Sequence, residues 1–142
     1  MNLDHQLAVA DMISEEYLRP DRVGNGKDRV SVDALNPAQL DSLPFGAIQL
    51  DHEGIILQYN DYESRLAGVG KSRAIGKNFF TEIAPCTDVK EFRGRFTEGV
   101  AKKQLHEKFQ YHFAFKKNPQ DVTVSLYYSG LTDSTWVFIR PL

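Results

Sequence analysis

The sequence predicts an α+β fold, with a central antiparallel five-stranded sheet flanked by helices. Two short strand-like runs lie close together near residue 50, an amphipathic helical run follows them, and three alternating runs fill the last third of the chain. Strands joined by short connections pair antiparallel, since parallel pairing needs a long crossover. The helical runs lie between the two groups of strands, so we expect helices on one face of the sheet.

The composition is typical of one globular domain. The chain has 142 residues, of which 42% are hydrophobic and 25% charged, and its formal net charge is −2. This balance gives no indication of a nucleic-acid or membrane-surface partner, and no apolar run approaches the length of a membrane span. The first residues lack a secretory signal pattern, and a single cysteine fits a reducing compartment. We therefore expect a cytoplasmic protein without membrane insertion, either a monomer or a weak dimer.

The first forty residues differ from the rest and are assigned to an N-terminal arm or cap, residues 1–40. The spacing of four apolar residues predicts one face of a short helix: Leu3, Leu7, Ala10 and Ile13. This helix is expected to end before Pro20, and the breaker sequence at 24–26 (GNG) favours a mobile connection. The globular domain is predicted to span residues 41–142.

That domain opens with a predicted hairpin. An apolar run over residues 45–50 and a second run over 55–59 flank the turn sequence 51–54 (DHEG). Asn60 follows the second run directly, where its side chain can cap a short helix over residues 61–66.

Further helical segments follow the hairpin. Asn78 is placed to cap a short turn that ends near residue 83, and residues 85–88 (PCTD) are typical of a loop. After this loop Phe92, Phe96 and Val100 recur every four residues, which indicates an amphipathic helix of about three turns.

The last third of the chain has the alternation of β-strands. Apolar and polar residues alternate over 109–115 and again over 122–128, with turn-forming residues at 116–121. A second turn at 130–134 leads to a final apolar run over 135–139. With the hairpin, these runs make five strands, in an element order that resembles a PAS domain, a common sensory module.

Several segments resemble the photoactive yellow protein family in register and without a gap. They are residues 43–51 (LPFGAIQLD), 56–60 (ILQYN), 75–80 (IGKNFF) and 84–88 (APCTD), and the match continues through 98–101 (EGVA) and 136–138 (WVF). The likeness covers roughly residues 40–142. The APCTD loop together with the upstream QYN, and a glutamate four residues after the tyrosine, is not a general feature of PAS domains.

This resemblance implies a PAS-like, chromophore-binding domain over residues 41–142 and a blue-light photoreceptor rather than an enzyme. The family carries p-coumaric acid (4-hydroxycinnamic acid) as a thioester on the loop cysteine, here Cys86. Tyr59 and Glu63 would hydrogen-bond the phenolate oxygen of this chromophore. Light would drive trans–cis isomerisation, proton transfer from Glu63 to the phenolate, and partial unfolding as the signalling state. The output would then go to another, unknown signalling protein.

The chemistry expected of such a site is reasonable in magnitude. The family's dark state keeps the chromophore phenol ionised and the glutamic acid protonated. Holding a plain phenol ionised at neutral pH requires a pKa lowered by about 3 units, or roughly 4 kcal/mol. Two charge-assisted hydrogen bonds of about 1.5–3 kcal/mol each can supply that.

Taken alone, the three residues have simpler interpretations. A lone cysteine such as Cys86 is most often a small buried hydrophobe, although a helix beginning near Thr87 or Asp88 would favour its thiolate. Glu63 fits a capping box three residues after the Asn60 cap, and would then only satisfy backbone donors. Tyr59 could be a strand-end tyrosine with its hydroxyl in water.

The sequence also departs from the family. Ala67 replaces a threonine whose hydroxyl orients the tyrosine, Val69 replaces an arginine that caps the pocket, and Lys117 replaces a methionine that assists thermal return. Phe115 replaces a nearby tyrosine, whereas Phe113 matches a pocket phenylalanine. We expect these changes to leave attachment intact, to allow some protonated, ultraviolet-absorbing chromophore near neutral pH, and to slow dark recovery.

Other functions remain open at this stage. The departures at Ala67, Val69 and Lys117 favour a chromophore-free PAS module for interaction or small-ligand sensing. A thiol enzyme would need a histidine base beside Cys86, and none of the four histidines lies in a recognisable catalytic segment. One cysteine with scattered histidines lacks the ligand spacing of a zinc site.

Overall fold

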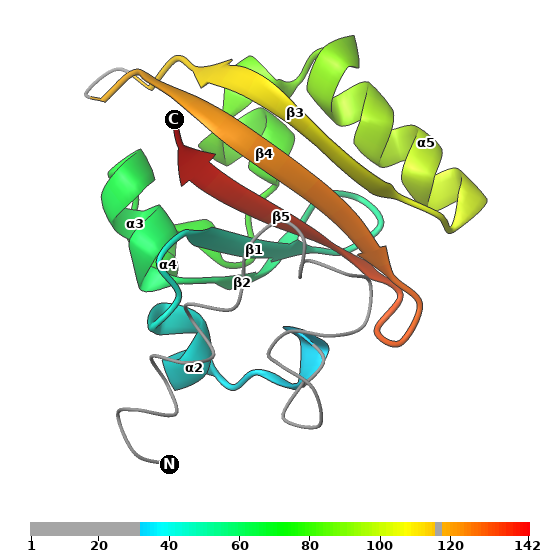
Figure 1. Ribbon diagram of the computed structural model, residues 1–142, viewed down its shortest axis with the longest axis horizontal. Coiled ribbons are helices and arrows are strands. Elements are labelled where there is room, and N and C mark those ends of the chain that lie inside the picture. The colour runs from blue at the N-terminus through cyan, green and yellow to red at the C-terminus, as the bar shows by residue number, and fades with distance from the viewer. Residues whose placement is uncertain (1–31, 116–117) are drawn as a thin grey trace.

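The computed structural model describes residues 32–115 and 118–142 (Figure 1). Its elements in chain order are η2 (Val32–Ala34), α2 (Pro37–Asp41), β1 (Gly46–Leu50), β2 (Ile56–Tyr59), α3 (Asp61–Ala67), α4 (Lys71–Ala74), η3 (Phe79–Ile83), η4 (Pro85–Thr87), η5 (Lys90–Gly94), α5 (Arg95–Lys102), β3 (His106–Phe113), β4 (Gln120–Ser129) and β5 (Ser134–Pro141). The helix predicted near the N-terminus, the break at 24–26 and Lys117 lie outside the described residues.

The five strands form one antiparallel sheet in the order β2-β1-β5-β4-β3, which Figure 1 shows edge to edge. The predicted α+β architecture with a five-stranded antiparallel sheet is therefore confirmed. β1 pairs with β5, and Gly46 lies opposite Ile139. The first and last strands along the chain are therefore neighbours inside the sheet. This pairing leaves β2 and β3 as the two edge strands.

Alternate residues of each strand point to opposite sides of the sheet. Both of these faces are covered by other parts of the chain. On β5, Val137 and Ile139 belong to the larger hydrophobic cluster, which the helices between β2 and β3 cover. Trp136 and Phe138 belong to a second cluster, which also contains Leu40 of α2. The expectation of helices on a single face is therefore wrong for α2.

The second cluster is closed by the segment before β1. Val32, Leu35 and Leu40 are all buried in it. Asp33 lies beside them and accepts hydrogen bonds from the side chains of Ser129, Thr132 and Trp136, the last at 2.7 Å. Part of the segment that the sequence assigned to the arm thus packs on the sheet and on the β4–β5 turn.

Asparagine caps start the short helices, as predicted. Asn60 Oδ1 accepts from the Glu63 backbone N–H at 3.1 Å at the start of α3, and Asn78 accepts from the first N–H groups of η3. The helix predicted around Phe92 and Val100 is also present, as η5 followed by α5.

Asn60 does more than cap a helix. Its Oδ1 also accepts from the Ala47 N–H at 3.0 Å, and its Nδ2 donates to the carbonyls of Leu40 and Phe45 at 2.8 and 3.0 Å. One buried side chain therefore joins α2, β1 and α3 at the point where β2 ends.

Candidate functional site

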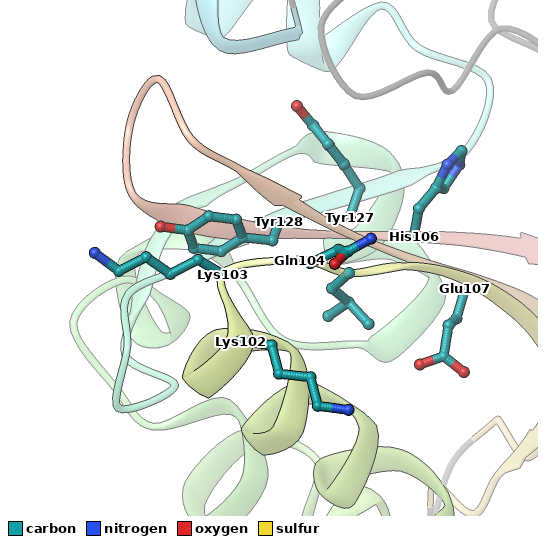
Figure 2. A pocket seen from close by; sticks show the side chains of 8 residues that line it. Lys102, Lys103, Gln104, His106, Glu107, Tyr127 and Tyr128 are labelled. Carbon is teal, nitrogen blue, oxygen red and sulfur yellow. The ribbon is translucent and has the colours of Figure 1, made fainter.

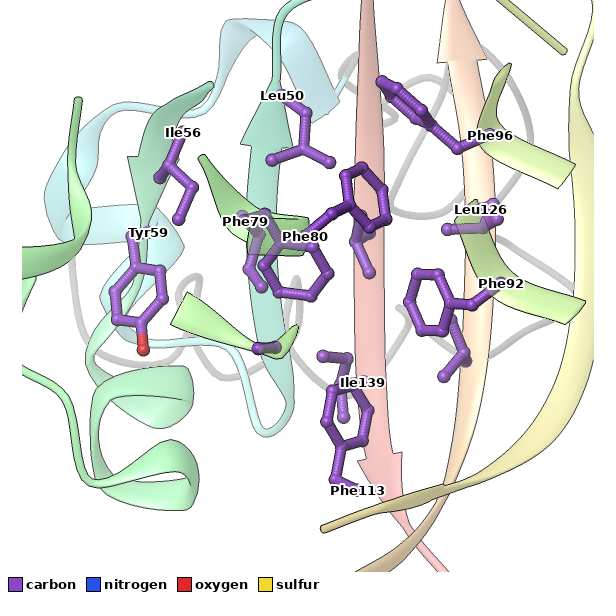
Figure 3. Packing of buried hydrophobic residues seen from close by; sticks show 14 of the residues in the cluster. Leu50, Ile56, Tyr59, Phe79, Phe80, Phe92, Phe96, Phe113, Leu126 and Ile139 are labelled. Carbon is purple, nitrogen blue, oxygen red and sulfur yellow. The ribbon is translucent and has the colours of Figure 1, made fainter. Parts of the chain in front are cut away.

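The larger hydrophobic cluster brings together residues that lie far apart in the chain. Tyr59 and Phe113 are buried members of it, and Val69 and Cys86 are partly buried against it. Figure 3 shows Tyr59 and Phe113 reaching into the cluster from different strands, which are the two edge strands of the sheet. Four of the seven predicted site residues therefore meet in one core region.

Tyr59 is the last residue of β2, and its side chain points inward. Only 3% of the residue is exposed, and its hydroxyl is buried without a hydrogen-bond partner. Burial raises the pKa of Tyr59, and the nearby charge of Glu63 raises it further. The alternative of a strand-end tyrosine with its hydroxyl in water is wrong.

Glu63 lies in the first turn of α3, and only 1% of the residue is exposed. Its Oε1 is buried without a hydrogen-bond partner. Burial disfavours the charged form and raises the pKa of Glu63 from 4.5 to about 8. The side chain is therefore mainly a neutral acid at pH 7.

The capping-box alternative for Glu63 is also wrong. A capping box would have its carboxylate accept from the Asn60 backbone N–H, but that N–H donates to the Ala47 carbonyl at 3.1 Å. The backbone of Glu63 is thus capped by Asn60, while its carboxyl group is left for another role.

Cys86 lies inside the short helix η4 (Pro85–Thr87) and carries a free, half-buried thiol. The expected helix start at Thr87 or Asp88 is wrong, because the next helix begins at Lys90. The turn is instead fixed by its own contacts. Thr87 is fully buried and its hydroxyl donates to the Ala84 carbonyl at 2.6 Å.

Tyr111 holds the same turn from the sheet. Its hydroxyl donates to the backbone carbonyl of Cys86, and its ring packs edge-on against Phe92 and Phe113 at 5.2 and 5.7 Å between centroids. Phe113 in turn is fully buried and stacks on Phe115 at 5.0 Å. The backbone of Cys86 is therefore tied to an aromatic wall on β3.

Two of the described positions that depart from the family pattern lie at or just after the end of α3. Ala67 is the half-buried last residue of α3, and Val69 follows it against the cluster. Lys71 pairs with Asp41 at 2.6 Å and with Asp61 at 3.0 Å. Ala67 and Val69 therefore place two small apolar side chains at the end of α3.

Several cavities lie outside this core. One of about 200 Å³ borders Tyr59 from the outside, between α2, β2 and α4. An open groove of about 550 Å³ lies where α5 meets β3 and β4, and Figure 2 shows the side chains that line it. In that groove Lys102 pairs with Glu98 and Tyr128 donates to Asp133. None of the predicted site residues lines it.

The arrangement has a definite chemical capacity. Two buried polar atoms, Tyr59 Oη and Glu63 Oε1, lack partners among residues 32–115 and 118–142, and leaving a buried polar group without a hydrogen bond costs free energy. They suit a polar atom of a small ligand, and Cys86 offers a thiol for a covalent bond. The described residues contain no group of three or more metal-ligating side chains, nor a helix long and apolar enough to cross a membrane.

Sequence reasoning missed two of these contacts. Tyr111 was identified only as a residue of an alternating strand, and Thr87 only as part of a loop motif. Their contacts with the Cys86 turn depend on how β3 lies against η4. The alternation of β3 places Tyr111 on the same face as Phe113, which was the only available signal.

Comparison with known proteins agrees with the fold. The model of the PAS fold family matches residues 34–141. The chain is 48% identical over 106 residues to the photoactive yellow protein of Rhodothalassium salexigens, covering 75% of this chain and 85% of the relative. It is 44% identical over 108 residues to the photoactive yellow protein of Halochromatium salexigens, covering 76% and 86%.

Solved structures give the same result. The photoactive yellow protein domain of the sensor histidine kinase Ppr from Rhodospirillum centenum is similar, with a TM-score of 0.74 and 44% identity, covering 77% of this chain and 96% of that chain. A PAS domain of an HTR-like protein from Haloarcula marismortui has a TM-score of 0.60 at 17% identity, covering 75% and 93%, which shows the fold alone.

Proposed function

This chain belongs to the photoactive yellow protein family, and on that premise we propose that it is a blue-light photoreceptor with p-coumaric acid bound as a thioester to Cys86. The observation that carries this proposal is the pair of buried, unpartnered atoms Tyr59 Oη and Glu63 Oε1 in the core region that Cys86 borders. A chromophore with an acyl group at one end and a phenolic oxygen at the other fits that arrangement. When bound, it would supply visible absorption and a double bond that isomerises from trans to cis.

The chain's own residues then have assigned tasks. Cys86 holds the acyl end, while Tyr59 and Glu63 hydrogen-bond the phenolate oxygen at the other end. Phe113 excludes water from one side. Because Glu63 is protonated at neutral pH, it can pass a proton to the phenolate after isomerisation. A carboxylate without a partner is then left in the core, which is costly, so the fold loosens into the signalling state.

We further propose that the arm, residues 1–40, is released in that state. Its described part is held to the sheet by a few apolar side chains and by Asp33, and weakly held segments open first. The similar domain of Rhodospirillum centenum is part of a sensor histidine kinase, which supports a signalling protein as the downstream partner. The single cysteine supports a cytoplasmic location.

The departures from the family are proposed to tune the site. Ala67 has no hydroxyl, and Tyr59 Oη has no protein partner, so the phenolate should be held less firmly. We expect an ultraviolet-absorbing protonated form near neutral pH, reduced in an Ala67→Thr variant. A titration that shows only the yellow form down to strongly acid pH contradicts this. Lys117→Met is expected to speed dark recovery in flash photolysis, and equal rates would remove that role.

The test of the proposal is an absorption spectrum after addition of activated p-coumaric acid, with Cys86→Ser as the control. A visible band that needs Cys86 and bleaches reversibly in blue light supports the photoreceptor. If wild type and control stay equally colourless, the proposal fails, and the chain is a PAS module without this chromophore.

A further inference from the structure

Gly46, the first residue of β1, lies directly against the side chain of Glu63. A carbon placed at the Cβ position of Gly46 would lie 2.2 Å from Glu63 Oε1, 3.3 Å from its Cδ and 3.4 Å from its Cβ. Real Cβ atoms essentially never come within 3.0 Å of a non-bonded heavy atom such as this oxygen. The carboxyl group of Glu63 therefore occupies the space that any other side chain at position 46 would fill.

The backbone at this position does not itself require glycine. The described glycines with positive φ are Gly54, Gly68 and Gly76, and Gly46 is not among them. Glycine inside a strand is destabilising relative to alanine, and it often marks a close approach of another group. Among the described glycines, Gly46 is the one whose added carbon would meet a carboxyl oxygen.

Neither β1 at Gly46 nor the first turn of α3 at Glu63 can move away easily. The strand is held at Gly46 by its register with Ile139 of the central strand β5. On the other side, Asn60 Oδ1 binds the backbone N–H groups of both Ala47 and Glu63, at 3.0 and 3.1 Å. One side chain thus fixes the distance between the start of β1 and the first turn of α3.

We propose that Gly46 is a positioning residue, whose bare backbone forms the cradle that holds the Glu63 carboxyl group dry in the core. The proposal deepens the photoreceptor function and rests on it for the use of that acid in signalling. Burial is what raises the pKa of Glu63 to about 8. A side chain at position 46 would therefore push the carboxyl group toward water and let it ionise.

The test is a Gly46→Ala variant of the full chain, measured before any chromophore is added. The carbonyl stretch of the protonated Glu63 acid is read by infrared spectroscopy and identified by its loss in a Glu63→Gln variant. Titration of this band in Gly46→Ala should give a pKa that falls from about 8 toward the ordinary 4.5. An unchanged band and titration in a folded Gly46→Ala protein would overturn the proposal.

Gly70 provides the matched control. It has an ordinary negative φ of −73° and nothing within 4 Å of an added Cβ. Gly70→Ala makes the same chemical change in open space, so the Glu63 band should titrate as in wild type. If Gly70→Ala shifts the band as much as Gly46→Ala does, the cradle is not the cause and the proposal is wrong.

A shorter acid should restore the site. In Gly46→Ala/Glu63→Asp the carboxyl oxygens end near the place of Glu63 Cδ, which the added carbon approaches to 3.3 Å rather than 2.2 Å. We expect the double variant to regain a buried, protonated acid band. A double variant whose acid ionises as in Gly46→Ala alone would contradict the steric argument.

Two further measurements keep the outcomes separate. If Gly46→Ala folds poorly, adding Glu63→Ala should recover the melting temperature, because the clashing carboxyl group is gone; no recovery overturns the proposal. Addition of activated p-coumaric acid then tests the light function. A wild-type protein that stays colourless removes the photoreceptor function, while the infrared result for Gly46 still stands or falls by itself.

Discussion

Replacing Glu63 by glutamine should make the protein much less sensitive to alkaline pH. The folded protein holds the Glu63 proton up to about pH 8, whereas the unfolded chain releases it near 4.5. Because the folded state binds more protons between these values, the free energy of unfolding falls as pH rises through this window. The contribution is fully present below pH 4.5 and is lost once the pH exceeds about 8.

The magnitude follows from the size of that window. At about 1.4 kcal/mol per pH unit, the span from 4.5 to about 8 is worth roughly 5 kcal/mol. This is an upper value, since water can enter to solvate the ionised group. Glutamine has nearly the same shape and carries no charge, so Glu63→Gln should remove this dependence and be the more stable protein above pH 8.

Urea unfolding of the full chain without chromophore, at about pH 5, 7 and 9, measures the effect. The difference between wild type and Glu63→Gln isolates this one group, because the other titrating residues are shared. Glu53→Gln removes an exposed acid and serves as the control. Parallel curves for wild type and Glu63→Gln over the whole range would refute the assignment of Glu63 as a buried neutral acid.

Three other substitutions test contacts around the site. Tyr111→Phe removes the hydroxyl that donates to the Cys86 carbonyl. Losing about 1 kcal/mol of local stability should let the Cys86 thiol react with a small reagent about fivefold faster; an unchanged rate would show that this hydrogen bond does not hold the turn. Asp33→Ala leaves the buried Trp136 indole N–H unpaired, so the emission of this single tryptophan should shift to the red and the stability should fall by about 1–3 kcal/mol; identical emission argues against an ordered contact. Asn60→Ala deletes four buried hydrogen bonds and should cost about 2–4 kcal/mol in urea unfolding, so a loss below about 1 kcal/mol would deny it the linking role.

Local patterns in the sequence were reliable wherever the structure depends on neighbours in the chain. The caps at Asn60 and Asn78 and the alternating strands were predicted at the right places, because caps and pleats involve residues a few positions apart. The weakest local prediction concerned Cys86. No periodic signal separates a short helix around Pro85 from the longer one that begins at Lys90, and boundaries are the least certain part of such predictions.

The sequence by itself predicted the fold class and the order of the strands along the chain, and its resemblance to a family pointed to Cys86, Tyr59 and Glu63 as site residues. Only the tertiary structure decided what surrounds them. Glu63 could have been a helix cap by spacing alone, but the structure buries its carboxyl group against Gly46 of β1. Tyr111 reaches the Cys86 carbonyl across 25 positions of the chain. Such contacts depend on which strands pair and how loops cross the sheet, and that information is absent from any local run of residues.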